Sequence, residues 1–243
     1  MIKRFFKKKA VATTYSWVRI NKGLFNGKTL FLPDSWGEKI INGEHESEII
    51  KTMELIVNQD GTFYDIGAHY GWFSIAWLSL NGKYVEAFEP SSYNKGIIKK
   101  TVEINEFGKN LNLHAFALGK KSEESELQLY PTDTSRNFIS KSKDNNLKTR
   151  ESIQIKSLDE IYDTLKLKKP DLIKIDVEGY EIEVLKGSKN LLKKLKPTII
   201  IEIHDVTNGL LVADFMSKLG FKMKILGYKG KNQTLPLVLW LPN

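Results

Sequence analysis

The stretch DIGAHYG, residues 65–71, follows the run GTFY at residues 61–64 and is typical of a buried strand that ends in a glycine turn. Glycines at such a strand exit let the backbone approach a ligand. A dinucleotide-binding turn has the pattern G-x-G-x-x-G, but His69 stands here where the middle glycine would be. The stretch therefore predicts a ligand-binding turn and leaves open which ligand it takes.

Apolar segments that alternate with helix-like segments surround this turn. The expected strands are residues 62–66, 84–88, 111–117, 172–175, 198–203, 221–226 and 235–240, and the expected helices are residues 72–80, 92–106 and 209–219. Apolar strands separated by helices indicate strands buried on both faces. We therefore predict an α/β fold with a doubly wound, mostly parallel seven-stranded sheet and helices on both faces.

The ends of the chain and one long polar segment set the expected organisation. Residues 1–40 are predicted to be a basic segment with a hairpin extension, because Asn26-Gly27 is a hairpin turn signal. Residues 36–57 have helix-compatible spacing, and residues 41–243 are expected to form the ligand-binding domain. The polar loop at residues 131–150 is unusually long for a compact domain, so it is either a lid over the acceptor or a flexible insertion.

Composition excludes several classes of protein. The chain of 243 residues has no cysteine, which excludes a disulfide framework and a thiolate zinc site and is compatible with the cytoplasm, where we expect the protein. The start is too polar for a signal peptide, and no apolar stretch reaches the roughly 18 residues of a membrane helix.

The net charge of +8 has no single explanation in the sequence. Five basic residues lie within residues 1–9, where they could contact an anionic membrane, contact nucleic acid or remain a solvated terminus. The other lysines are widely spread, so we expect no specific nucleic-acid partner. The apolar and aromatic content of the first 35 residues leaves a homo-oligomer contact open.

Acids and a histidine follow four of the predicted strands. In open parallel sheets the ligand binds beyond the carboxyl ends of the strands. These ends carry Asp65, Glu89, Asp176, Glu178, Glu202 and His204. Any one of them alone is usually a solvated charge or a helix cap, but together at one edge of the sheet they predict a site.

The ligand that fits these residues is a cation that carries an adenosine. Glu89 lies 22 residues beyond Gly67, which suits an acid that accepts hydrogen bonds from a ribose. His69 argues against a pyrophosphate, and with it against a nicotinamide-dependent oxidoreductase. S-adenosylmethionine has an adenosine, a sulfonium cation and an amino-acid tail, so we predict it as the cofactor, with Gly67 and Gly71 beside its methionine part.

Five motifs in one order carry a family resemblance. They are DIGAHYG, AFEP at residues 87–90, HAFALG at 114–119, LIKIDVEGYEIEVLKG at 172–187 and IIEIH at 200–204. Over roughly residues 40–226 the chain resembles the FkbM family of S-adenosylmethionine-dependent methyltransferases. The resemblance implies a class I, Rossmann-like methyltransferase fold and O-methylation of a hydroxyl group on a sugar, a glycan or glycolipid, or a polyketide-type metabolite.

The resemblance also implies roles for matching residues. These are the cofactor turn (Asp65, Gly67, Ala68, Gly71), the ribose acceptor (Glu89), the adenine neighbours (Ala117, Leu118) and the groups that face the methyl group and the acceptor (Asp176, Glu178, Glu202, His204). The family usually has Asn where this chain has His69, so the role of His69 as a cofactor-binding residue stays open.

Two mechanisms are compatible with the acidic strand ends. His204 can act as the general base, with Asp176 or Glu202 orienting its ring. Alternatively, Asp176, Glu202 and His204 can hold Mg²⁺ or Mn²⁺, which would acidify the acceptor hydroxyl. The competing functions are a class I methyltransferase that acts on RNA or protein, and a non-enzymatic module at the membrane.

Overall fold

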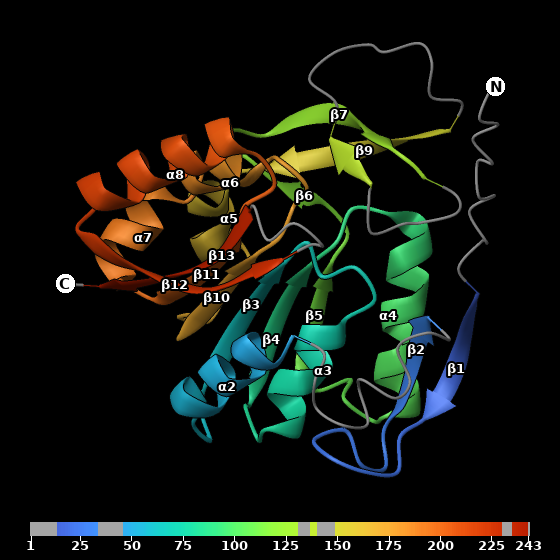
Figure 1. Cartoon of the computed structure of the whole chain (residues 1–243). Helices are drawn as coiled ribbons and strands as arrows, with labels where there is room; N and C mark the ends of the chain where they lie inside the picture. Colours follow the sequence, from blue (N-terminus) through green and yellow to red (C-terminus); the bar gives the residue numbers. More distant parts are fainter. Residues whose placement is uncertain (1–13, 34–45, 131–136, 140–148, 230–234, 243) are drawn as a thin grey trace, which may run out of the picture.

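The computed structural model describes residues 14–33, 46–130, 137–139, 149–229 and 235–242. A central sheet has seven strands in the order β12-β13-β11-β10-β3-β4-β5 (Figure 1). They are β3 (Thr62–Ile66), β4 (Tyr84–Phe88), β5 (Leu111–His114), β10 (Leu172–Ile175), β11 (Thr198–Glu202), β12 (Phe221–Lys229) and β13 (Leu235–Pro242). Strands β11, β10, β3, β4 and β5 are parallel, and β13 is antiparallel to both of its neighbours. The predicted sheet is therefore confirmed.

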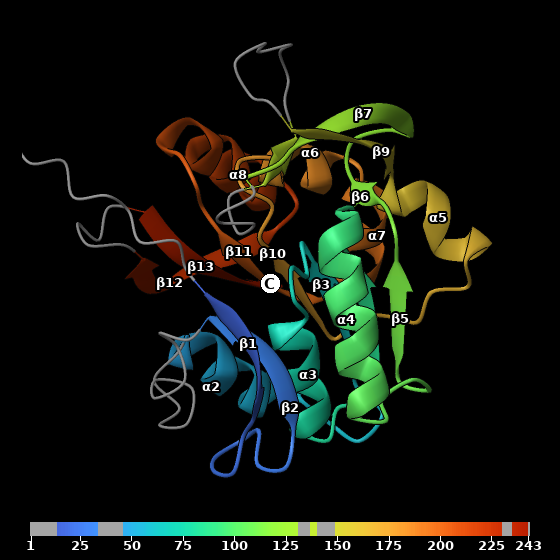
Figure 2. The ribbon, with the colours of Figure 1, turned by 90° about the vertical axis from the view of Figure 1, so that its right-hand side faces the viewer.

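Helices cover both faces of this sheet (Figures 1 and 2). One face packs against α2 (Ser47–Ile56), α3 (Trp72–Ser79) and α4 (Ser92–Ile104), and the other against α5 (Leu158–Thr164), α6 (Glu181–Lys186), α7 (Lys189–Leu195) and α8 (Val206–Lys218). Each face has its own apolar core. Because both faces are covered, most residues of β3, β4, β10 and β11 are apolar, and the polar residues Asp65, Glu86 and Lys174 among them are buried.

An N-terminal hairpin completes the core over α3. Six of the eight residues of this helix are buried, so it has no polar face to turn toward water. Strands β1 (Tyr15–Arg19) and β2 (Thr29–Pro33) pair antiparallel beside it, and Leu30 and Leu32 join the core that contains Trp77. The hairpin is thus packed onto the central domain.

Two sequence expectations need revision, and the predicted hairpin is confirmed. The third strand ends at His114, and Ala117 already belongs to another sheet. The hairpin pairs β1 with β2, and Asn26-Gly27 lies in the connection between them. Helix α2 begins only at Ser47, and the earlier part of the helix predicted for residues 36–57 lies outside the described residues.

A second, four-stranded sheet lies beyond the carboxyl ends of β3, β4 and β5 (Figure 1). Its order is β6-β9-β7-β8, with β6 (Ala117–Leu118), β7 (Glu123–Gln128), β8 (Phe138–Ile139) and β9 (Arg150–Lys156). Strand β8 is the ordered centre of the predicted polar loop, whose residues 131–136 and 140–148 lie outside the described residues, as do residues 1–9. No helix in the described ranges is long and apolar enough to cross a membrane.

The strand order reverses between β3 and β10. The chain continues from β3 to β4 and β5 on one side, and β10 and β11 lie on the other. Asp176, just after β10, donates its backbone N–H to the carbonyl of Ile66 at 3.0 Å. Such a switch point leaves a crevice in which ligands bind.

Candidate active site

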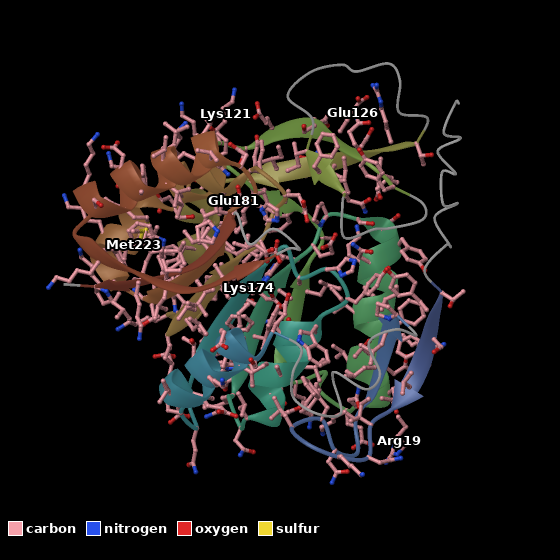
Figure 3. The ribbon with its side chains drawn as sticks, in the orientation of Figure 1. Arg19, Lys121, Glu126, Lys174, Glu181 and Met223 are labelled. Atoms are coloured by element: carbon pink, nitrogen blue, oxygen red, sulfur yellow. The ribbon has the colours of Figure 1, made fainter. Side chains whose placement is uncertain are left out.

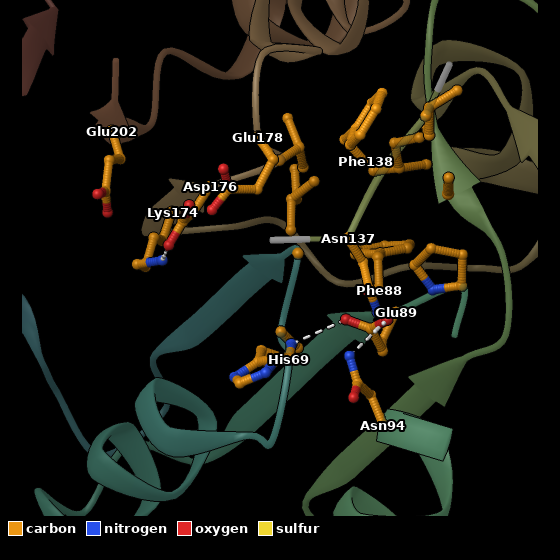
Figure 4. Close-up of a pocket in the computed structure, with 18 of the residues that line it drawn as sticks. His69, Phe88, Glu89, Asn94, Asn137, Phe138, Lys174, Asp176, Glu178 and Glu202 are labelled. Atoms are coloured by element: carbon orange, nitrogen blue, oxygen red, sulfur yellow. Dashed lines mark hydrogen bonds and ion pairs between the residues drawn. The ribbon is translucent and has the colours of Figure 1, made fainter. Parts of the chain in front are cut away.

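A cavity of about 310 Å³ opens at this switch point (Figure 4). Its wall comes from the turn after β3, the ends of β4, β10 and β11, and the second sheet. Nine of the residues predicted for the site line it: Gly67, Ala68, His69, Glu89, Ala117, Leu118, Asp176, Glu178 and Glu202. The sequence therefore located the cavity correctly.

Three of the predicted residues, Asp65, Gly71 and His204, do not line the cavity. Asp65 is buried beneath the turn, where its Oδ2 accepts a hydrogen bond of 2.6 Å from Ser74, and burial is the main cause that raises its pKa. Gly71 caps α3 with φ +80°. Asp65 and Gly71, predicted as part of the cofactor turn, thus shape this turn from below and do not line the cavity.

Glu89 forms one end of the cavity. Its carboxylate is almost fully buried and accepts hydrogen bonds from the N–H groups of Ser91 and His69, both at 2.9 Å, and from Asn94 Nδ2 at 3.3 Å. Burial raises the pKa of Glu89 to about 7, although these hydrogen bonds act in the opposite direction. A carboxylate at the end of the second parallel strand is suited to ribose hydroxyls.

The backbone of His69 explains the residue type found there. His69 has φ +53°, and its N–H donates a hydrogen bond to the Glu89 carboxylate. Its ring stacks on Tyr70 with 3.7 Å between the ring centroids. Asn and His are among the non-glycine residues that adopt this left-handed conformation most readily. The exchange of the usual Asn for His69 therefore preserves the conformation of the turn.

The wall next to Glu89 is mostly apolar and holds two unsatisfied polar atoms. Apolar side chains here are Phe88, Pro90, Ala117, Leu118, Leu127, Phe138 and Ile139. Within the described residues, Asn94 Oδ1 and Asn137 Nδ2 are buried without a hydrogen-bond partner. Buried polar atoms normally have partners, so a ligand with both donors and acceptors on a flat apolar ring would complete this wall. Adenosine has these properties, and the residues fit S-adenosylmethionine.

Carboxylates form the opposite end of the cavity (Figure 4). Asp176, Glu178 and Glu202 line it together with Lys174, whose side chain is almost fully buried (Figure 3). Lys174 Nζ lies 2.7 Å from Asp176 Oδ2 and 4.5 Å from the centroid of the Phe73 ring. Lys174 thus pairs with a carboxylate that lines the cavity.

His204 contacts these carboxylates from outside the cavity. Its Nε2 lies 3.4 Å from Asp176 Oδ1, 3.5 Å from Glu178 Oε1 and 4.0 Å from Glu202 Oε1. Burial lowers the pKa of His204, but the hydrogen bonds to Glu178 and Glu181 and the charge of Asp176 outweigh burial and raise this pKa to about 11. In the metal-free protein the ring therefore carries a positive charge at neutral pH.

Glu181 is a site residue that the sequence analysis did not assign. It is fully buried, and its carboxylate accepts hydrogen bonds from His204 Nδ1 at 2.6 Å, from Gly179 N–H at 3.0 Å and from Asn208 Nδ2. The ring of His204 is thus oriented by Glu181, and the expected orientation by Asp176 or Glu202 is corrected. Strand-end reasoning missed Glu181 because it is the first residue of α6.

The predicted metal ligands do come together. One ligand atom each of Asp176, Glu202 and His204 lies within 4.8 Å of the others. The bond from His204 Nδ1 to Glu181 resembles the second bond that a metal-bound imidazole usually makes. Within the described residues, four carboxylates (Asp176, Glu178, Glu181 and Glu202) gather around the cations of Lys174 and His204. Carboxylate oxygens with one imidazole are a donor set that suits a divalent cation.

Residues 65–223, more than half of the chain, match the family described as the methyltransferase FkbM domain. The chain belongs to the FkbM methyltransferase family. A relative of this FkbM chain, the hexuronic acid methyltransferase AglP of Haloferax volcanii, is 27% identical over 171 residues, which are 70% of the chain and 66% of AglP.

Solved structures show the same fold. An FkbM methyltransferase of Methylobacillus flagellatus has a TM-score of 0.57 at 14% identity, covering 85% of the chain and 61% of that protein. An rRNA methylase of Streptococcus thermophilus has a TM-score of 0.51 at 13% identity, covering 82% and 95%. The FkbM chain thus spans just under two thirds of AglP and of the M. flagellatus protein. The family and the class I methyltransferase fold inferred from the motifs are confirmed.

Proposed function

We propose that the chain transfers a methyl group from S-adenosylmethionine to a hydroxyl group of a sugar, with uronic acid residues of glycans as the first acceptor class. One observation carries this proposal: a single cavity joins the nucleoside-like end at Glu89 to the carboxylates at Asp176, Glu178 and Glu202. Membership in the FkbM family and the name of the AglP relative support the choice of reaction and acceptor.

The residues at each end have separate tasks. When bound, S-adenosylmethionine supplies an electrophilic methyl group on a positive sulfur. Glu89 would accept hydrogen bonds from its ribose, and Asn94 and Asn137 would form hydrogen bonds with the polar atoms of its adenosine. The turn at His69 would support the amino-acid part, and the net negative charge of the acidic end would favour the sulfonium.

The carboxylates at the acidic end bind and deprotonate the acceptor. Sugar hydroxyls donate hydrogen bonds to carboxylates, which align one oxygen for methyl transfer. Because its carboxylate partners raise the pKa of His204 to about 11, the ring is mainly protonated at pH 7 and is a poor proton acceptor. We therefore assign the proton acceptor to Asp176, Glu178 or Glu202, which line the cavity, and regard His204 as the charge that holds them in place.

A divalent cation is the second candidate for this cluster. Mg²⁺ or Mn²⁺ would bind Asp176, Glu202 and His204 Nε2 in place of the imidazolium proton, and it would acidify a bound hydroxyl. Turnover is measured after removal of metals with a chelator and again after each metal is restored. Loss of activity with recovery would support metal dependence, and turnover that the chelator leaves unchanged would exclude it.

Cofactor binding is expected to weaken in acid because of Glu89. Its carboxylate can accept ribose hydrogen bonds only when ionised, and its pKa is about 7. The affinity for S-adenosylhomocysteine should therefore fall about tenfold from pH 8 to pH 6, as the proton competes with the ligand. Calorimetry at both pH values measures this change. Glu89→Gln should bind more weakly and lose the pH dependence, and wild-type affinity that is constant with pH would contradict the assignment.

The proposed reaction is tested with labelled S-adenosylmethionine and separate acceptors. The acceptors are uronic acid oligosaccharides, neutral oligosaccharides, cell-surface glycan extracts, total RNA and a protein extract, and mass spectrometry locates the methyl group. We expect an O-methyl sugar. Label found only in RNA or protein would refute the proposal in favour of the alternative methyltransferase function.

A further inference from the structure

Aromatic side chains form a continuous strip beside the cavity. We name Tyr15, Trp17, Phe31, Tyr70 and Tyr93 the aromatic strip. The ring centroids lie 5.2 Å apart for Trp17 and Phe31, 5.4 Å for Phe31 and Tyr70, and 6.5 Å for Tyr70 and Tyr93. The hairpin, the turn before α3 and helix α4 contribute these rings, and the hairpin packs beside α3 and α4 (Figure 2).

Packing of the core accounts for Tyr70, which is buried, but not for the other four rings of the strip. In the hairpin, Trp17 pairs with Phe31, and Val18 pairs with Leu30 on the opposite face. Leu30 is in the core, whereas Trp17 and Phe31 remain partly exposed and Tyr93 is 56% exposed. A row of large, partly exposed aromatic rings next to a cavity is typical of a binding surface.

The strip is continuous with the cavity through His69. This residue lines the cavity, and its ring stacks on Tyr70 at 3.7 Å. Tyr70 is buried and contacts the rings of Tyr15, Phe31 and Tyr93. A linear ligand that extends from the cavity past His69 therefore meets the exposed parts of these neighbouring rings.

Positive charge accompanies the aromatic rings. Lys100 Nζ of α4 lies 4.9 Å from the centroid of the Trp17 ring. Arg19, two residues after Trp17, lies on the same face of β1 and is exposed (Figure 3). Sugar rings have an apolar face of C–H groups that packs on aromatic rings, and acidic sugars add carboxylates that attract Lys and Arg.

We propose that the aromatic strip binds the sugar residues next to the methylated one in an acidic oligosaccharide. The ligand class rests on the proposed function, but the binding surface is a separate element of the protein. The strip would give long acceptors a higher affinity than single sugars. The protein would thereby favour glycans over free monosaccharides as acceptors.

The test compares galacturonic acid with its linear hexamer by calorimetry, in the presence of S-adenosylhomocysteine. The wild-type protein should bind the hexamer at least about tenfold more tightly than the monomer. Trp17→Ala, Tyr93→Ala and Lys100→Ala should each reduce hexamer affinity severalfold and leave monomer affinity unchanged. Lys99→Ala is the matched control, because Lys99 is an exposed neighbour on the same helix.

Each other outcome has a definite meaning. Equal affinity for hexamer and monomer, no binding of either, or a hexamer preference that survives the substitutions in the strip would overturn the proposal. A change of sedimentation coefficient in Trp17→Ala without any effect on the hexamer would assign the strip to a second copy of the chain. Hexamer binding that depends on the strip, without methyl transfer to any sugar, would refute the proposed function alone.

Discussion

Glu181→Gln is expected to lower the rate of methyl transfer by about 100-fold, because displacing the groups around the reacting atoms by about 1 Å can cost that much. The neutral amide removes one of the carboxylates that raise the pKa of His204, and it is the one whose oxygen lies 2.6 Å from His204 Nδ1 and orients the ring. The ring would then no longer hold Asp176 and Glu178 in place. Because neither Glu181 nor His204 lines the cavity, the affinity for S-adenosylhomocysteine should stay within about twofold of the wild-type value.

Kinetics and binding together separate this role from general damage to the fold. Glu181→Ala would leave the buried His204 Nδ1 without its hydrogen-bond partner, at a cost of about 1–3 kcal/mol, so the isosteric Gln variant is the informative one. Glu183→Gln is the control, because Glu183 lies on the same helix but pairs with Lys186 at the surface. Equal turnover of Glu181→Gln and wild type would show that His204 needs no charged partner. Loss of cofactor affinity would indicate a structural role.

The fold could be predicted because it depends on local patterns. Most of the parallel strands are short, mainly apolar runs between turn signals, as burial on both faces favours. Seven of the nine cavity residues lie at or just after the end of a parallel strand, and the topology alone brings these ends together, whereas Ala117 and Leu118 were placed by the family resemblance.

The remaining site residues depend on contacts that no local pattern encodes. Glu181 reaches His204 and Asn208 only because α6 packs against the exit of β11 and the start of α8. Asn94 and Asn137 become important only when their unsatisfied atoms are known to be buried at the cavity. Asp65 has the same position in the motif as a cofactor ligand would have, but its side chain turns inward to Ser74.

Gly67→Ala is expected to destabilise the protein by at least about 3 kcal/mol, which corresponds to a fall in Tm of at least about 6 °C for a chain of this size. Gly67 has φ +81°, where an L-residue is strained by about 1–2 kcal/mol. An added Cβ would also lie 1.9 Å from the carbonyl oxygen of Asp176, which is backbone and cannot rotate away. Thermal unfolding of the variant without ligand measures the effect.

Gly71→Ala separates the strain of the left-handed backbone from the contact between the added Cβ and a backbone oxygen. Gly71 has nearly the same φ, +80°, but an added Cβ would meet only the side chain of Ile98, at 3.4 Å. Its loss of stability should therefore stay near the 1–2 kcal/mol of backbone strain. The additional loss of stability in Gly67→Ala, relative to Gly71→Ala, measures the close contact between the cofactor turn and the backbone of Asp176. If Gly67→Ala lost cofactor affinity but were no less stable than Gly71→Ala, the glycine would be required for contact with the ligand and not for contact between β3 and β10.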